Sequence, residues 1–137
     1  MSVQLSVTVR NARLDAIETA IGATAVLKIY DLTAGAPADT SAAIVGTVLA
    51  TCTLPADYMN AAAAGSKTLL GTWEDLSADN TGTADFFRIF ESTATTCHIQ
   101  GTCTLTAGGG DMTIDNTSFV AGQTFTVSTF TLTDANP

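Results

Sequence analysis

The stretch V-G-T-V-L-A-T-C-T-L, Val45 to Leu54, has apolar side chains at every second position over most of its length. This alternation is typical of a β-strand with one buried face, because successive side chains of a strand point to opposite sides. Similar short runs recur from residue 25 to residue 133, separated by Gly, Asn, Asp and Pro. The pattern predicts a mainly β protein, a single-domain antiparallel β-sandwich or jelly-roll-like barrel over residues 1–137.

The most hydrophobic of these runs is Thr83–Glu91. Its even positions place Phe86 and Phe90 on one face, and its odd positions place Phe87 and Ile89 on the other. Apolar residues on both faces indicate either a central strand or a strand whose outer face meets a partner.

The last expected strand, Thr124–Thr133, changes phase midway. Phe125 and Val127 lie on one side of this strand, and Phe130 and Leu132 lie on the other. A one-residue shift of this kind predicts a β-bulge near Ser128, or a strand that leaves one sheet and joins a second.

The opening of the chain has a different, helical spacing from Thr8 to Gly22. We expect Thr8 to be the N-cap and Gly22 to end the helix. One side of this helix is apolar and the other is polar. The apolar side holds Leu14, Ile17, Ala20 and Ile21, and the polar side holds Asn11, Asp15, Glu18 and Thr19.

Arg10 and Arg13 fall near the apolar side of this helix and close to its first turn, where the helix dipole disfavours cations. Two interpretations fit this placement. Both side chains can extend outward past a core-facing helix. Alternatively, this end of the helix docks on a neighbouring subunit that supplies carboxylates.

The charge of the chain limits its partners. It has 13 acidic and 5 basic residues, a formal net charge of −8. Nucleic acids and anionic membranes both attract basic surfaces, so neither is an expected partner. We find no apolar stretch of membrane-spanning length and no signal-peptide pattern, and we therefore expect synthesis in a cytosol.

Few residues are suited to catalysis, and the chain is not expected to be an enzyme or to hold a cofactor. The single histidine, His98, lies in a Thr-rich strand without a recognisable motif around it. Cys52, Cys97 and Cys103 alternate with apolar residues and are expected to be buried in the core.

A calcium site was considered for the acidic loop D-L-S-A-D-N-T-G-T-A-D. It offers Asp75, Asp79, Asn80 and Asp85, but the spacing does not match an EF-hand, so we expect turn-forming residues and no metal.

Several segments together resemble one protein family. They are V-R-N-A-R-L-D-A-I-E-T-A-I-G-A-T-A-V-L-K-I-Y (Val9–Tyr30), G-T-V-L-A (Gly46–Ala50), L-P-A-D-Y-M (Leu54–Met59), D-N-T-G-T-A-D-F-F-R-I-F (Asp79–Phe90) and D-M-T-I-D-N-T-S-F-V-A-G-Q-T-F-T-V (Asp111–Val127). The chain resembles small virion proteins of tailed bacteriophages, whose members open with an R-N-A-x-L-D-A-I helix running into a first strand.

The resemblance implies a structural protein of a phage particle and carries over no catalytic residues. The preferred hypothesis is a capsid decoration, or cement, protein on the capsid surface that binds the major capsid protein and forms homo-oligomers. The alternatives are a head–tail or tail component, and a glycan-binding module that would need exposed Tyr58 and Trp73. The residues expected to contact a partner are Arg10, Arg13, Leu14 and Ile17, with Phe87 and Ile89 if their face is not internal.

Overall fold

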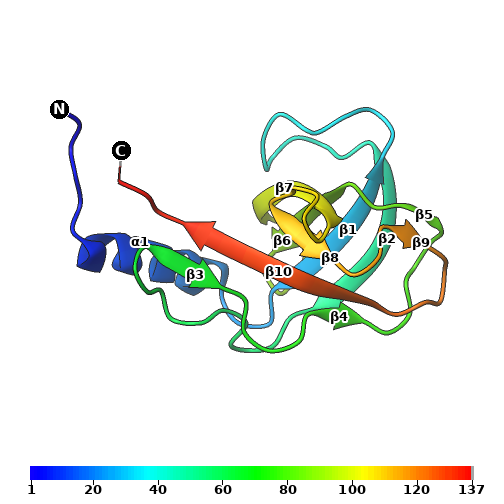
Figure 1. Cartoon of the computed structure of the whole chain (residues 1–137). Helices are drawn as coiled ribbons and strands as arrows, with labels where there is room; N and C mark the ends of the chain where they lie inside the picture. The colour runs from blue at the N-terminus through cyan, green and yellow to red at the C-terminus, as the bar shows by residue number, and fades with distance from the viewer. Residues whose placement is uncertain (137) are drawn as a thin grey trace.

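The computed structural model describes residues 1–136, and its chain is mainly β, with 39% of residues in strands and 11% in one N-terminal helix (Figure 1). The predicted fold class is therefore confirmed. The elements are α1 (Val7–Ile21), β1 (Val26–Leu32), β2 (Gly46–Thr53), β3 (Ser66–Thr68), β4 (Glu74–Asp75), β5 (Gly82–Thr83), β6 (Phe86–Phe90), β7 (Cys97–Leu105), β8 (Met112–Ile114), β9 (Ser118–Phe119) and β10 (Phe125–Thr133).

Eight strands form one sheet in the order β2-β1-β6-β7-β8-β10-β3, with β4 also paired to β10, while β5 and β9 form a separate pair. The pairs are antiparallel, as expected, except that β7 and β8 are parallel. The sheet curves so that β4 comes close to β2, where the Thr51 backbone N–H donates to Asp75 Oδ2 at 3.1 Å. This curvature encloses one main core between the two halves of the sheet.

Strand β6 is central, as its apolar pattern indicated. It lies between β1 and β7, and all five of its residues are buried. The loop between β1 and β2 covers its outer face, and the Arg88 side chain is hydrogen-bonded to this loop. Arg88 Nη2 donates to the carbonyls of Ala42 at 2.8 Å and Asp39 at 3.1 Å, and its Nε donates to Gln100 Oε1 at 3.0 Å.

The predicted bulge in the last strand is confirmed. The register of β10 against β8 shifts between Val127 and Thr129. Because one extra residue reverses the alternation, Phe125, Val127 and Phe130 all reach the main core.

Helix α1 begins two residues earlier than expected. Ser6, not Thr8, is the N-cap, and its side-chain oxygen accepts from the Val9 N–H at 3.3 Å. The helix ends as expected at Gly22, whose φ of 86° suits glycine and whose N–H donates to the Glu18 carbonyl.

The polar side of α1 docks on the segment that leads into β3. The decisive partner is Lys67, whose side chain is only 3% exposed. Its Nζ lies 2.9 Å from each of three acceptors: Asp15 Oδ1, Glu18 Oε2 and the Asn60 carbonyl. Three donors and three acceptors match, so the buried charge is fully hydrogen-bonded.

The same two carboxylates also hold the backbone of the neighbouring segment. Glu18 Oε1 accepts from the N–H groups of Tyr58 and Met59, and Asp15 Oδ1 accepts from that of Ala62 at 2.9 Å. The hydrogen bond from Lys67 is the largest cause that lowers the pKa of Asp15, and the bonds to both carboxylates raise the pKa of Lys67 despite its burial. The helix is therefore attached mainly by charge-assisted hydrogen bonds.

The main core contains a group of aromatic rings around Trp73. Trp73 is fully buried, and its ring centre lies 6.0 Å from that of Tyr58 and 5.4 Å from that of Phe130. Its Nε1–H donates to the carbonyls of Tyr58 and Leu70. The indole thus fills core volume and also satisfies backbone acceptors.

We predict that Lys67→Met lowers the free energy of unfolding by about 1–3 kcal/mol, because it removes the buried cation from Glu18 and from the half-exposed Asp15. Denaturant unfolding followed by circular dichroism measures this. The matched control is Lys28→Met, since Lys28 Nζ only lies over the Phe90 ring at 5.4 Å, and its loss should cost about 0.5–1 kcal/mol. Equal effects of the two substitutions would contradict the role given to Lys67.

Trp73→Ala is expected to cost about 3–5 kcal/mol, because it removes a fully buried ring and leaves a cavity. Thermal and denaturant unfolding measure the change. Leu76→Ala serves as the control, because Leu76 is 70% exposed and its truncation should change stability little. A Trp73→Ala protein as stable as the wild type would show that the ring is not a core element.

Candidate protein-interaction surface

The six residues expected to contact a partner separate into buried and accessible groups. Phe87 and Ile89 are 1% and 0% exposed. Their face of the strand is internal, so they are not available for the partner contact that was expected if this face lay outside. Leu14 is also buried, at 3% exposure, and is likewise unable to dock on a partner; Ile17 is half-buried and packs against the core. Both helix residues point inward because α1 lies against the end of the sheet.

Arg10 does not extend into solvent. Its Nη1 donates to the Asp134 carbonyl at 2.8 Å, and its buried Nε has no hydrogen-bond partner among residues 1–136. The guanidinium lies against Gly65, which has a φ of +75°. A Cβ at Gly65 would clash with Arg10 Nη1 and lie 2.9 Å from the Asp134 carbonyl oxygen. Arg10 is therefore a structural link between the helix and the C-terminal segment.

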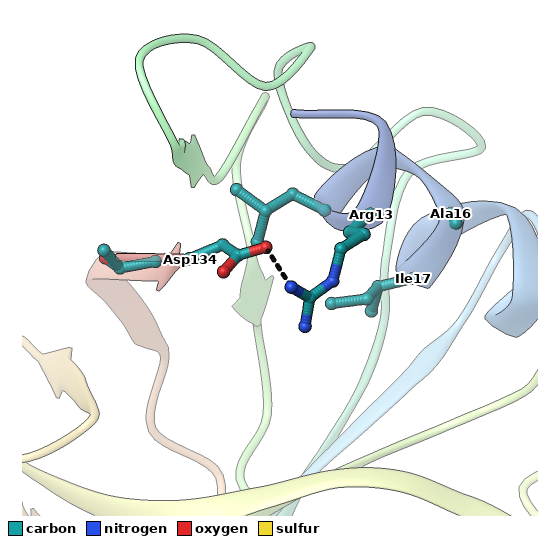
Figure 2. Close-up of a pocket in the computed structure, with 6 residues that line it drawn as sticks. Arg13, Ala16, Ile17 and Asp134 are labelled. Atoms are coloured by element: carbon teal, nitrogen blue, oxygen red, sulfur yellow. Dashed lines mark ion pairs between the residues drawn. The ribbon is translucent and has the colours of Figure 1, made fainter. Parts of the chain in front are cut away.

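Arg13 is the accessible arginine. Its side chain is 60% exposed, and its Nη1 lies 3.3 Å from Asp134 Oδ2. Figure 2 shows this ion pair spanning the gap between the helix and the end of β10. The carboxylate that pairs with Arg13 here belongs to Asp134 of the same chain, and docking of this end of the helix on a neighbouring subunit stays a prediction. The Asp134 side chain is only 15% exposed, but because the Arg13 side chain is largely solvated, its guanidinium can still bind an external partner.

An open groove of about 410 Å³ runs beside this pair (Figure 2). It is lined by Arg13, Leu14, Ala16, Ile17, Thr133 and Asp134. Its helix side is mostly apolar, and its opposite side is the backbone end of β10.

The outward side of α1 forms a second surface, which we call the outer helix face. It consists of exposed residues at helical spacing, namely Val9, Ala12, Arg13, Ala16 and Ala20. Apart from Arg13 the residues are small or apolar, which is unusual for the solvent side of a helix. Apart from Arg13, sequence reasoning missed this surface, although the spacing of 9, 12, 16 and 20 was a readable signal.

The acidic loop considered for calcium uses its side chains internally. Asp75 accepts from the N–H groups of Thr51 and Ser77, and Asp79 accepts from the Thr51 hydroxyl at 2.9 Å. Asn80 donates to the Val48 carbonyl, and Asp85 accepts from the Leu32 N–H. Within residues 1–136 no group of three or more His, Cys, Asp or Glu side chains is arranged to hold a metal ion.

The cysteines are free and buried, as expected for core residues. Burial is the main cause that raises the pKa of Cys52 to about 11 and that of Cys103 to about 12, so neither favours the reactive thiolate.

His98 is exposed, with Nε2 3.9 Å from Glu91 Oε2. That carboxylate accepts hydrogen bonds from Thr93, Thr95 and Thr96, and its pKa is lowered to about 2, with the Thr93 hydroxyl the largest cause.

The glycan-binding alternative needed an exposed aromatic platform. Tyr58 and Trp73 are 1% and 0% exposed, so they offer no stacking surface. Burial is also the main reason that the pKa of Tyr58 is raised to about 12.

Comparisons with protein-family models, curated proteins and solved structures found no match to this chain. Over the described residues, α1 is the one helix, and it is too short and too polar to span a membrane.

The two arginines should differ in their effect on stability. Arg10→Ala is expected to cost about 1–3 kcal/mol, because the Asp134 carbonyl loses a charge-assisted hydrogen bond and Gly65 loses the guanidinium packed against it. Arg13→Ala should cost less than about 1 kcal/mol, as for other exposed ion pairs. Denaturant unfolding of both variants checks this, and a larger loss for Arg13→Ala would reverse their assigned roles.

Proposed function

We propose that this protein is a structural protein of a tailed-bacteriophage virion, which decorates the capsid by binding to the major capsid protein. The observation that carries the proposal is the outer helix face: an exposed stripe of small and apolar residues with one accessible cation. The sequence resemblance to phage virion proteins supplies the class of partner.

The stripe is suited to close contact with a flat protein surface. Its three alanines lose no side-chain entropy on binding, and small residues allow a helix to approach its partner closely. Val9 is 45% exposed and adds apolar area at one end of the stripe. Arg13 adds a directional contact to a carboxylate of the partner, which favours one orientation of docking.

The attachment of α1 also supports this role. Lys67 and the two carboxylates hold the helix in place before any partner arrives. A preformed surface loses little conformational entropy on binding, so more of the contact energy remains as affinity. Repeated over a symmetric shell, even modest contacts would oppose rupture by packaged DNA.

The test uses purified particles of the phage that encodes this chain, and shells that lack the protein. Ala16→Glu places a bulky charge in the middle of the outer helix face and is expected to abolish co-sedimentation with the shells while the free protein keeps its unfolding transition. Val120→Asp is the control, because Val120 is also exposed, at 58%, and lies outside the helix. Shell binding by Ala16→Glu at wild-type affinity would refute docking through this face.

Copy number in intact particles tests the virion assignment itself. Decoration requires hundreds of copies per particle, whereas a head–tail or tail ring requires about a dozen or fewer on symmetry grounds. Quantitative mass spectrometry of purified virions distinguishes these outcomes, and absence of the chain from virions would end the proposal.

A further inference from the structure

The N-terminal segment before α1 is an exposed, apolar arm. Met1 and Val3 are 123% and 84% exposed, and Met1, Val3 and Leu5 alternate with the polar Ser2 and Gln4. In an extended conformation this alternation places the three apolar side chains on one side. Figure 1 shows the arm leaving the helix and pointing away from the body of the protein, alongside the C-terminal end.

The root of this arm is fixed. The Leu5 N–H donates to Asn136 Oδ1, and Asn136 Nδ2 donates to the Leu5 carbonyl, both at 2.9 Å. The residues before Leu5 therefore start from a defined point next to the end of β10. Four extended residues reach about 13 Å from that point.

A strand edge lies open beside the same point. On one side, β10 is paired by β4 at Phe125–Thr126 and by β3 at Thr131–Thr133. On the other side, β8 pairs only as far as Phe130, opposite Met112, so no strand among residues 1–136 covers Thr131–Thr133 there. The Phe130 carbonyl and the Asp134 N–H form hydrogen bonds on the β3 side of the strand. Because backbone groups of successive strand residues point to opposite sides, those of Thr131 and Thr133 point to the open side.

The apolar groove adjoins this open edge, since Thr133 belongs to both. An extended segment that paired with Thr131–Thr133 would therefore have the apolar helix residues Ala16 and Ile17 beside it. Open edges of this kind accept an added strand, and alternate side chains of that strand enter adjoining pockets.

We propose that the arm of a second copy of this chain adds as a strand to the Thr131–Thr133 edge, with Val3 in the groove. The arm root and the receiving edge lie within a few residues of each other, at Asn136 and Thr133. Reciprocal exchange about a two-fold axis then brings each arm to the other copy's edge at once, as a closed dimer requires. The arm does not bind the groove of its own copy, because it points away from the body of that copy.

The first test is the mass of the purified protein in solution by light scattering and analytical ultracentrifugation. We expect twice the chain mass of 14.0 kDa, and the monomer mass after deletion of residues 1–4 or after Val3→Asp. Val120→Asp should remain dimeric, and circular dichroism should give the same fold for all variants. A wild-type monomer at millimolar concentration, or a dimer that survives arm deletion, would overturn the proposal.

The second test identifies the receiving edge. One chain carries Val3→Cys and a differently tagged chain carries Thr133→Cys; the natural cysteines are buried and should not interfere. Oxidation of the mixture is expected to give the mixed disulfide in high yield. A disulfide formed only when both substitutions are in one chain would mean that the arm folds back on its own groove, and would refute exchange. Neither test uses virus particles, so their outcome is independent of the proposed function.

Discussion

The buried ammonium group of Lys67 is the interaction on which the arrangement of this protein depends. Its three acceptors come from two elements, Asp15 and Glu18 from the helix and Asn60 from the segment before β3. A charge this deeply buried is tolerated only when each donor is satisfied, so these bonds favour the observed position of the helix. The amides of Tyr58, Met59 and Ala62 use the remaining acceptor capacity of the carboxylates. Orientation of the helix is thus set by polar geometry more than by apolar burial.

Fixing the helix also fixes both ends of the chain. Arg10 bonds to the Asp134 carbonyl across Gly65, Arg13 pairs with the Asp134 carboxylate, and Asn136 bonds to Leu5. The accessible groove, the open part of β10 and the apolar arm consequently lie together at one end of the molecule (Figure 1). The opposite end consists of loops whose acidic side chains mostly bind neighbouring backbone.

This distribution explains why a structural role fits the chain. The charged residues are largely used to hold segments together: Lys67 and Arg10 for the helix and C-terminus, Arg88 for the loop over β6. The outer helix face of α1 is small, apolar and preformed, with Arg13 as the one charged residue among the five that define it. Such a surface is suited to contact with another protein.

The sequence by itself determined the class of the fold, the central position of β6, the bulge in β10 and the burial of the three cysteines. These features follow from the two-residue period of strands, which local sequence records directly. Tertiary structure alone decided that Asn11, Asp15 and Glu18 face the body, that Arg10 and Arg13 meet Asp134, and that Leu14, Phe87 and Ile89 are unavailable to a partner. The physical reason is that a polar side chain is driven inward only when a matching group meets it there. Lys67 and Asp134 are supplied by segments roughly 50 and 120 residues away, a pairing that no local pattern encodes.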